Sequence, residues 1–371
     1  MAKLKVAIAC QGGGSHAAFA AGLLRRLLLD EMEHIDIRGL SGTSGGAICA
    51  ALAWAGLIQG RPEEGAERLM RFWEIAKADT PVDYAANFWG KWLGRAQLLP
   101  ETSPYRLPAP AAAIMRDWLE ETLDIPGLPT GKARKAIQLL VGATDVLSGA
   151  RCIFTGEHLA YDDLIASAAI PTLYEAVETR GRFHWDGLFS VNPPIRNLVF
   201  LDIDELWVVQ INPTNCARVP MTMGEIIDRR NELSGNVALA QELHLVETVN
   251  DFVRSNPGVA IRSRHNRVMR EIPIRLVEAG LDEFDYVSKL DRTPHFIDDL
   301  LERGWHKAPL FRSEESVWPR RGAVQPRAIT VSGPSSAQDQ ASQQPAVAGS
   351  GVASPSMAPS AASPASDAPA I

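Results

Sequence analysis

The stretch GLSGTSGGAICAALAWAG, from Gly39 to Gly56, places one serine, Ser44, among glycines where a strand-like segment gives way to a helix-like one. Upstream, IDIRGLSG begins with the alternating apolar residues of a strand. Downstream, AICAALAWAGLI is rich in Ala and Leu, which favour a helix. Such a turn projects the Ser44 hydroxyl at a helix N-terminus, where the dipole favours negative charge. Gly42 and Gly46 complete a G-x-S-x-G pattern, which is typical of a nucleophilic serine.

The segments on either side of this turn predict an α/β fold. KVAIAC is expected to form a buried strand, and AAFAAGLLRRLLLDEM a helix that follows a Gly-rich turn. Further strands are expected in KAIQLLVGATDV, RCIFTG and ELWVVQIN, and further helices in YDDLIASAA, in residues 223–253 and in TPHFIDDLLERGWHKA. Because strands and helices alternate, we expect a mostly parallel sheet with crossover helices.

Composition suggests one domain, residues 1–318, followed by a tail. Within the domain, residues 60–131 form an irregular, Trp-rich helical insertion with two interpretations. Its aromatic rings pack inward as the core of a subdomain, or the segment caps an apolar substrate pocket or touches a membrane. Residues 319–371 are mostly Ala, Ser, Pro, Gln and Gly, and we expect this tail to be disordered.

The charge and hydropathy of the chain exclude some classes of function. A net charge of −7 over 371 residues argues against a nucleic-acid partner, because nucleic-acid binding needs a basic surface. No apolar stretch reaches the roughly 18 residues of a membrane span, and no signal peptide is recognisable. We therefore expect a cytoplasmic protein, soluble or peripherally attached to a membrane. A run of arginines in residues 262–275 is interpreted as a solvated face or as a contact with anionic headgroups.

Four cysteines lie far apart, mostly in apolar runs: Cys10, Cys49, Cys152 and Cys216. We expect them to be buried thiols in a reducing compartment. Their spacing does not fit a zinc site, so we expect no metal, and no motif calls for a cofactor.

A second motif is the Gly-rich segment QGGGSHAAF between the first expected strand and helix. Its consecutive glycines, Gly12 to Gly14, let backbone N–H groups converge on one spot, which suits an oxyanion or a phosphate. Nucleotide binding is disfavoured, because the Walker A ending G-K-[ST] is missing and the Rossmann pattern would need a glycine at Ala17. A plain tight turn remains the alternative.

A third motif is the segment FHWDGLFSVNPPI, in which Asp186 and Gly187 follow a short strand-like stretch. An aspartate in a turn is commonplace, but here it becomes a candidate base for the upstream serine. A Ser–His–Asp hydrolase would need a late histidine in a turn after a strand, and the late histidines lie in helix-like or basic stretches: His244, His265, His295 and His306. His184 shares a strand face with Asp186, so it is the one candidate for a triad.

Together the three motifs resemble the patatin-like phospholipase family, over about Lys5 to Val199 and more weakly to Arg312. The family pattern has a loop G-G-G-x-[RK]-G, a serine in G-x-S-x-G and an aspartate in D-G-[GA], in this order. The resemblance implies a three-layer α/β/α fold, with Ser44 as the nucleophile and Asp186 as its partner in a dyad. It also implies an oxyanion hole formed by Gly12, Gly13, Gly14 and Ser15.

Other positions match the family pattern or depart from it. SAAIP, from Ser167 to Pro171, and the Asn192–Pro193 pair look like further family features. His16 stands where Arg or Lys is usual, Ala17 where Gly is usual, and Leu188 replaces the second Gly of D-G-G. Because of these three departures, a catalytically degenerate lipid-binding protein is kept as an alternative function.

The expected function is hydrolysis of a lipid ester, of the phospholipase A or esterase type, through an acyl-enzyme. Ser44 would attack the carbonyl carbon, Asp186 would accept the serine proton, and the Gly-rich loop would hold the oxyanion. The alternatives are another apolar ester, such as a polyester or thioester, and the degenerate lipid-binding protein. The sequence predicts neither the headgroup nor the oligomeric state.

Overall fold

The computed structural model describes residues 2–80, 83, 87, 103–106, 111–171, 173–216, 219–259, 268–281, 283–284 and 286–318. The tail from residue 319, predicted to be disordered, lies outside the described residues, as do Trp89 and Trp92 of the expected insertion.

In the described residues, nine strands form one mixed sheet in the order β5-β6-β3-β2-β1-β7-β8-β9, with β4 also paired to β3. The strands are β1 (Leu4–Cys10), β2 (Ile35–Thr43), β3 (Gln138–Asp145), β4 (Arg151–Thr155), β5 (Val177–Thr179), β6 (Arg182–Asp186), β7 (Glu205–Gln210), β8 (Ile274–Glu278) and β9 (Val317–Trp318). The central strands β3, β2, β1, β7 and β8 are parallel, whereas β4, β6 and β9 run antiparallel to their neighbours. The predicted mostly parallel sheet is confirmed.

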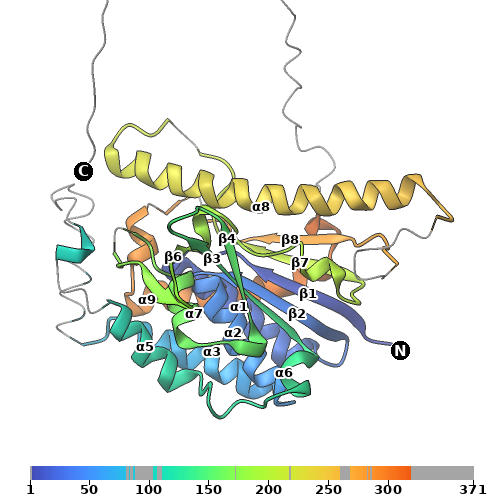
Figure 1. Ribbon diagram of the computed structural model, residues 1–371, viewed down its shortest axis with the longest axis horizontal. Coiled ribbons are helices and arrows are strands. Elements are labelled where there is room, and N and C mark those ends of the chain that lie inside the picture. The colour runs from blue at the N-terminus through green and yellow to red at the C-terminus, as the bar shows by residue number, and fades with distance from the viewer. Residues whose placement is uncertain are drawn as a thin grey trace, which may run out of the picture. The chain divides into compact units, whose positions relative to one another are not determined.

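Helices flank this sheet on both faces (Figure 1). The described helices are α1 (Ala18–Arg26), α2 (Gly45–Ile58), α3 (Pro62–Ala76), α5 (Ala111–Thr122), α6 (Lys132–Ala136), α7 (Tyr161–Ser167), α8 (Met223–Ser255) and α9 (Pro294–Lys307). Figure 1 shows α8 along one face of the sheet and α1, α2 and α3 on the other. None of the described helices is both long enough and apolar enough to span a membrane.

Alternate residues of β1 face the two helical layers. Val6, Ile8 and Cys10 belong to a core cluster with the buried side chains of α1, α2, α3 and α9. Ala7 and Ala9 belong to a second cluster, which includes apolar side chains from the middle of α8. This alternation is the two-residue period of a strand, and it explains why VAIAC, residues 6–10, is apolar throughout.

Helix α2 begins directly after Ser44 and is buried along its whole length. Its sequence is apolar on every side, as expected for a helix enclosed by other elements. Gly56 of α2 packs so closely against α3 that a Cβ there would lie 2.3 Å from the backbone nitrogen of Gly65. The position of Ser44 is therefore set by a rigid part of the core.

Two predictions can be compared with the described residues: the placement of the aromatic rings in residues 60–131 and the burial of the cysteines. Phe72 and Trp73 of α3 are buried, and Phe72 packs edge-to-face with Trp118 of α5 at 6.2 Å. These rings belong to the core. Burial of the cysteines was predicted too broadly: Cys10 and Cys49 are buried, but Cys216 is exposed, because it lies in the loop between β7 and α8.

Candidate active site

Ser44 occupies a strained turn between β2 and α2. Its φ of 55° and ψ of −133° lie in a region that residues with a side chain rarely adopt. The carbonyl of Ser44 accepts hydrogen bonds from the N–H groups of Ala47 at 2.9 Å and Ile48 at 3.2 Å, and the second is the first α-helical bond of α2. Its own N–H donates to Oγ of Ser167 at 2.9 Å. The turn is therefore held on both sides of the serine.

The glycines of the G-x-S-x-G pattern are required by close packing. A Cβ on Gly42 would lie 2.4 Å from the carbonyl carbon of Gly46, and a Cβ on Gly46 would lie 2.5 Å from the carbonyl oxygen of Cys10. Gly187 is equally enclosed, because its Cβ would lie 2.6 Å from the carbonyl oxygen of Gly142. A side chain at any of these three positions would clash with neighbouring backbone and push the surrounding strands away from the Ser44 turn.

The register of β3 brings Asp186 next to the serine. Thr43, the last residue of β2, lies opposite Gly142, and Asp186 of β6 lies opposite Ala143, the next residue of β3. Because β4 occupies the other edge of β3 at this point, β2 and β6 share one edge. The strand ends that carry Ser44 and Asp186 therefore meet.

The carboxyl group of Asp186 is buried, and the N–H of Leu188 donates to its Oδ1 at 2.8 Å. Asp186 is 1% exposed, and burial raises its pKa to about 7 against the opposing effects of the Leu188 N–H and of the neighbouring Ser44 side chain. A carboxyl group with this pKa can accept a proton near neutral pH.

The Gly-rich loop packs directly on the serine. A Cβ on Gly12 would lie 2.8 Å from Cβ of Ser44, so only glycine allows this approach. Gly14 has a φ of +58° and begins a short helical turn, η1 (Gly14–Ala17), in which Ser15 is buried. In the described part of the chain, the N–H groups of Gly13 and Gly14 have no hydrogen-bond acceptor. The N–H of Gly12, in contrast, donates to the side chain of Asn192 at 2.8 Å.

The three departures from the family pattern are all accommodated by packing. His16 is buried, its Nε2 lies 2.7 Å from Oγ of Ser288, and burial, together with the charge of Lys289, lowers its pKa to about 3. Ala17 is buried, and Leu188 packs beneath α8. His16 is thus a neutral ring.

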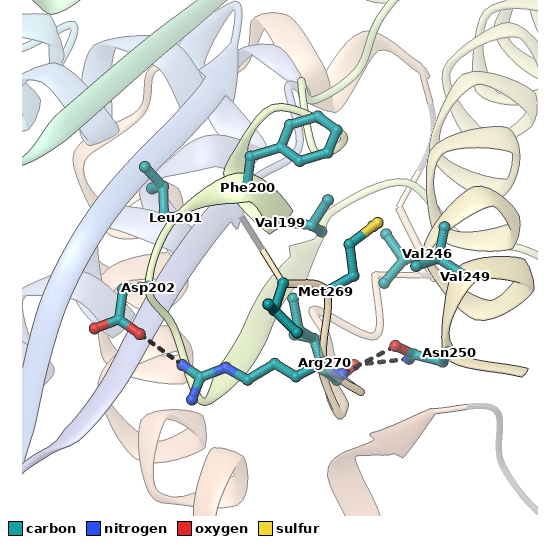
Figure 2. A pocket seen from close by; sticks show the side chains of 11 residues that line it. Val199, Phe200, Leu201, Asp202, Val246, Val249, Asn250, Met269 and Arg270 are labelled. Atoms are coloured by element: carbon teal, nitrogen blue, oxygen red, sulfur yellow. Dashed lines mark hydrogen bonds and ion pairs between the residues drawn. The ribbon is translucent and has the colours of Figure 1, made fainter. Parts of the chain in front are cut away.

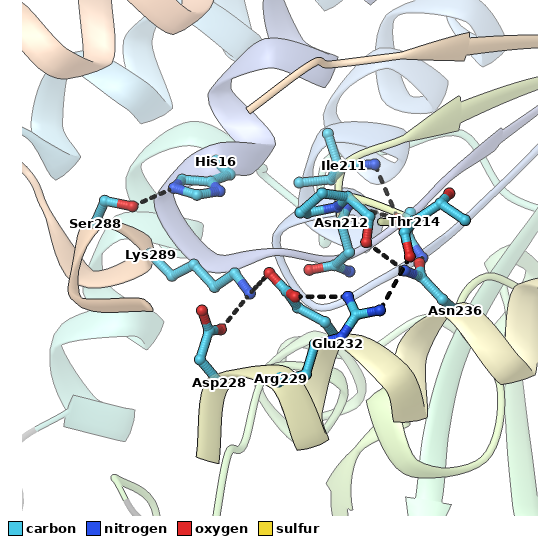
Figure 3. A network of polar contacts seen from close by, with 12 residues as sticks. His16, Ile211, Asn212, Thr214, Asp228, Arg229, Glu232, Asn236, Ser288 and Lys289 are labelled. Atoms are coloured by element: carbon cyan, nitrogen blue, oxygen red, sulfur yellow. Dashed lines mark hydrogen bonds and ion pairs between the residues drawn. The ribbon is translucent and has the colours of Figure 1, made fainter. Parts of the chain in front are cut away.

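A cation does lie near His16, on another element (Figure 3). Lys289 of the turn η7 (Tyr286–Leu290) forms ion pairs with Asp228 at 2.9 Å and Glu232 at 3.6 Å, both on α8. A Cβ on Gly14 would lie 2.4 Å from the carbonyl oxygen of Lys289. The N-terminal half of α8, η7 and the Gly-rich loop are therefore packed together.

No described histidine lies between the serine and the aspartate. His184 is buried and packs edge-to-face on Phe154 at 5.2 Å, and burial lowers its pKa. The late histidines in the described residues are exposed: His244, His295 and His306. His265 lies outside the described residues.

The structure adds residues that the sequence did not single out. Asn212 follows β7 and donates from Nδ2 to the carbonyl of Gly12 at 3.0 Å. Ser167, noted only as part of SAAIP, supports the Ser44 turn. One signal could have found Asn212, because side chains at the carboxyl ends of neighbouring parallel strands lie at one edge of a sheet.

One further cavity lies away from this site. A cavity of about 310 Å³ lies between the turn η6 (Leu198–Phe200), the C-terminal half of α8 and residues 268–272 (Figure 2). None of its lining residues belongs to the Ser44 site. Arg270 at its edge pairs with Asp202 at 2.9 Å. In the described residues, no cluster of His, Cys, Asp and Glu could hold a metal ion.

Comparisons with known proteins give one matching family and several similar solved structures. Residues 8–199, more than half of the chain, match the model of the family described as patatin-like phospholipase. The crystal structure of VipD from Legionella pneumophila is similar, with 13% identity, a TM-score of 0.41, and 82% of this chain and 66% of that chain covered. The ExoU–SpcU complex from Pseudomonas aeruginosa is similar, with 13% identity, a TM-score of 0.35, and 85% of this chain and 52% of that chain covered. No curated protein matches at the sequence level.

Proposed function

The chain belongs to the patatin-like phospholipase family, and we propose that it is a serine-dependent lipid acyl hydrolase that cleaves carboxylic esters through a Ser44–Asp186 dyad. One observation carries the proposal. The register of β3 brings a buried carboxyl group with a pKa of about 7 beside a serine hydroxyl that stands at a strained strand–helix turn. This is the arrangement in which a carboxylate can activate a serine directly.

The proposed reaction has two steps. In the first, Ser44 Oγ attacks the ester carbonyl carbon while Asp186 takes the hydroxyl proton, and Asp186 then gives this proton to the departing alcohol. In the second, Asp186 takes a proton from water as the water attacks the acyl-enzyme. The same proton returns to Ser44 Oγ when the carboxylic acid leaves.

The negative charge on the carbonyl oxygen needs hydrogen-bond donors. We assign this role to the N–H groups of Gly13 and Gly14, with Ser15 as the remaining member of the predicted oxyanion hole. The N–H of Gly12 is bonded to Asn192, so Gly12 contributes chiefly by letting the loop approach Ser44. Loss of one oxyanion donor typically costs about 3 kcal/mol in the transition state.

The departures at His16, Ala17 and Leu188 are built into the packed site, because His16 and Ala17 are buried and the N–H of Leu188 donates to Asp186. This favours an active enzyme over a degenerate lipid-binding protein. A thioester or polyester substrate would use the same dyad, and peripheral contact with a membrane stays a prediction.

A chain-length series of p-nitrophenyl esters tests the proposal. We expect the wild type to hydrolyse butyrate, octanoate and palmitate esters, with kcat/KM rising with chain length. Ser44→Ala should lose about 10³-fold or more. Ser41→Ala is the matched control, because Ser41 is a buried serine of β2, the strand that leads to Ser44, and its hydroxyl has no partner among the described residues. Equal rates for wild type and Ser44→Ala would contradict the proposal.

A further inference from the structure

Two buried amide side chains hold the Gly-rich loop from outside. Oδ1 of Asn192 accepts the N–H of Gly12 at 2.8 Å, and Nδ2 of Asn212 donates to the carbonyl of Gly12 at 3.0 Å. Asn192 is fully buried and Asn212 nearly so. Because an N–H requires an acceptor and a carbonyl requires a donor, the main chain fixes the orientation of both amides.

These two bonds hold the peptide units on both sides of Gly12, and the bond from Asn212 sets where the N–H of Gly13 points. The N–H of Gly12 belongs to the peptide unit before it, and the carbonyl of Gly12 shares a planar unit with the N–H of Gly13. In a trans peptide the carbonyl and the N–H point in opposite directions. By holding the Gly12 carbonyl, Asn212 turns the Gly13 N–H away from itself.

The loop cannot supply this order from its own side chains. Glycines lose more conformational freedom on ordering than other residues, and Gly12 to Gly14 are consecutive. Gly12 also lies in contact with Ser44, so its peptide units border the reacting hydroxyl. Hydrogen bonds from outside the loop can hold such donors in place before the substrate arrives, and donors held in this way stabilise the transition state most effectively.

The backbone of Asn212 is anchored, whereas the amide of Asn192 is only partly hydrogen-bonded. Oε1 of Gln11 accepts the N–H groups of Ile211 and Asn212, at 2.9 and 2.8 Å, and fixes the backbone of Asn212; Figure 3 shows Ile211 and Asn212 in this network. Asn192 follows the Asp186 loop, and its Nδ2 has no partner in the described residues. A buried donor without an acceptor destabilises a fold, so stability alone does not account for an amide at this position.

We propose that Asn192 and Asn212 are positioning residues that hold the Gly-rich loop in its oxyanion-binding conformation. The proposal rests on the proposed hydrolase function. It implies that losing either amide weakens binding of the transition state more than binding of the substrate, so kcat falls while KM changes little.

Asn192→Leu and Asn212→Leu test this, with kcat and KM measured on p-nitrophenyl butyrate. We expect kcat to fall by about 10²-fold in each and KM to stay within about threefold of the wild type. The matched control is Asn250→Leu. Asn250 is also buried and holds a backbone, that of Ile272, through bonds of 2.8 and 2.9 Å, but it lies near the cavity of Figure 2. It should lose stability and keep kcat.

The outcomes separate the two proposals. Wild-type kcat in folded Asn192→Leu and Asn212→Leu, or an equal loss of kcat in Asn250→Leu, would overturn the positioning role. If the Leu variants do not fold by circular dichroism, Asn192→Ser and Asn212→Ser replace them. These variants keep a polar but shorter side chain and should show the same loss of kcat, and wild-type kcat in them would overturn the role equally. A wild type that hydrolyses no ester would overturn the hydrolase function itself.

Discussion

The backbone N–H of Ser44 donates a 2.9 Å hydrogen bond to Oγ of Ser167. The same hydroxyl donates to the carbonyl of Gly142 at 2.6 Å, so it links the strained turn to β3. Ser167 ends α7 and is fully buried. A residue 123 positions away in the sequence therefore supports the positive φ of the candidate nucleophile.

Ser167→Ala should destabilise the protein by about 1–3 kcal/mol, because it leaves the Ser44 N–H buried without an acceptor. It should also lower kcat by about tenfold or more, since the Ser44 hydroxyl loses its fixed direction. Urea unfolding and ester hydrolysis measure the two effects. Ser41→Ala should show neither. Unchanged kcat in a destabilised Ser167→Ala protein would mean that this bond supports only the fold.

The value of kcat/KM should depend on pH through Asp186. Burial raises the pKa of this carboxyl to about 7, and the proposed base must be ionised to accept the serine proton. Below about pH 7 we expect kcat/KM on p-nitrophenyl butyrate to fall about tenfold for each pH unit, and above it to level off. A profile that is flat between pH 5 and 9 would rule out Asp186 as the base.

Asp186→Asn should stabilise the protein at pH 8 relative to the wild type. The pKa of Asp186 is about 7 in the fold against 3.8 for an unperturbed aspartate, so the unfolded chain ionises first as the pH rises. The wild type therefore loses stability between about pH 4 and pH 7, by up to about 4 kcal/mol, and the loss then levels off. Urea unfolding at pH 4 and pH 8 measures this. If the two proteins differed in free energy of unfolding by the same amount at pH 4 and at pH 8, this would contradict the claim that burial raises the pKa of Asp186.

His184→Phe should retain kcat within about threefold. His184 packs edge-to-face on Phe154, a contact that a phenyl ring can keep, and the proposed mechanism has Asp186 take the Ser44 proton without it. The check is kcat on p-nitrophenyl butyrate together with circular dichroism. A folded variant as inactive as Ser44→Ala would require a Ser–His–Asp triad.

The parts of the fold that depend on local sequence pattern could be predicted from the sequence. The G-x-S-x-G turn, α2 and the apolar strands β1 and β2 are all indicated by composition and period. Strand β8 was missed, because the arginines of the segment before and within it suggested a solvated face. Arg275 lies on β8 and pairs with Glu205 of the neighbouring β7 at 3.3 Å, and Arg270 pairs with Asp202. These two arginines are bound within the protein.

The site depends on pairings over long sequence distances, which a single sequence does not specify. The motifs identified Ser44 and Asp186 as candidate catalytic residues. The register of β2 and β6 on β3 is what brings their strand ends together. Asn212 carries no motif, and its role follows only from a hydrogen bond 200 positions away in sequence. Contacts of this kind arise from tertiary packing.

The central claim is that Ser44 and Asp186 act as one catalytic unit on an ester. The most direct test compares kcat/KM for an octanoate ester among the wild type, Ser44→Ala, Asp186→Asn and the double variant, with folding checked by circular dichroism. We expect each single variant to lose about 10³-fold or more, and the double variant to be no more than about threefold worse than either, because residues of one unit are not additive. An Asp186→Asn protein within tenfold of the wild type, or losses that multiply in the double variant, would contradict the dyad.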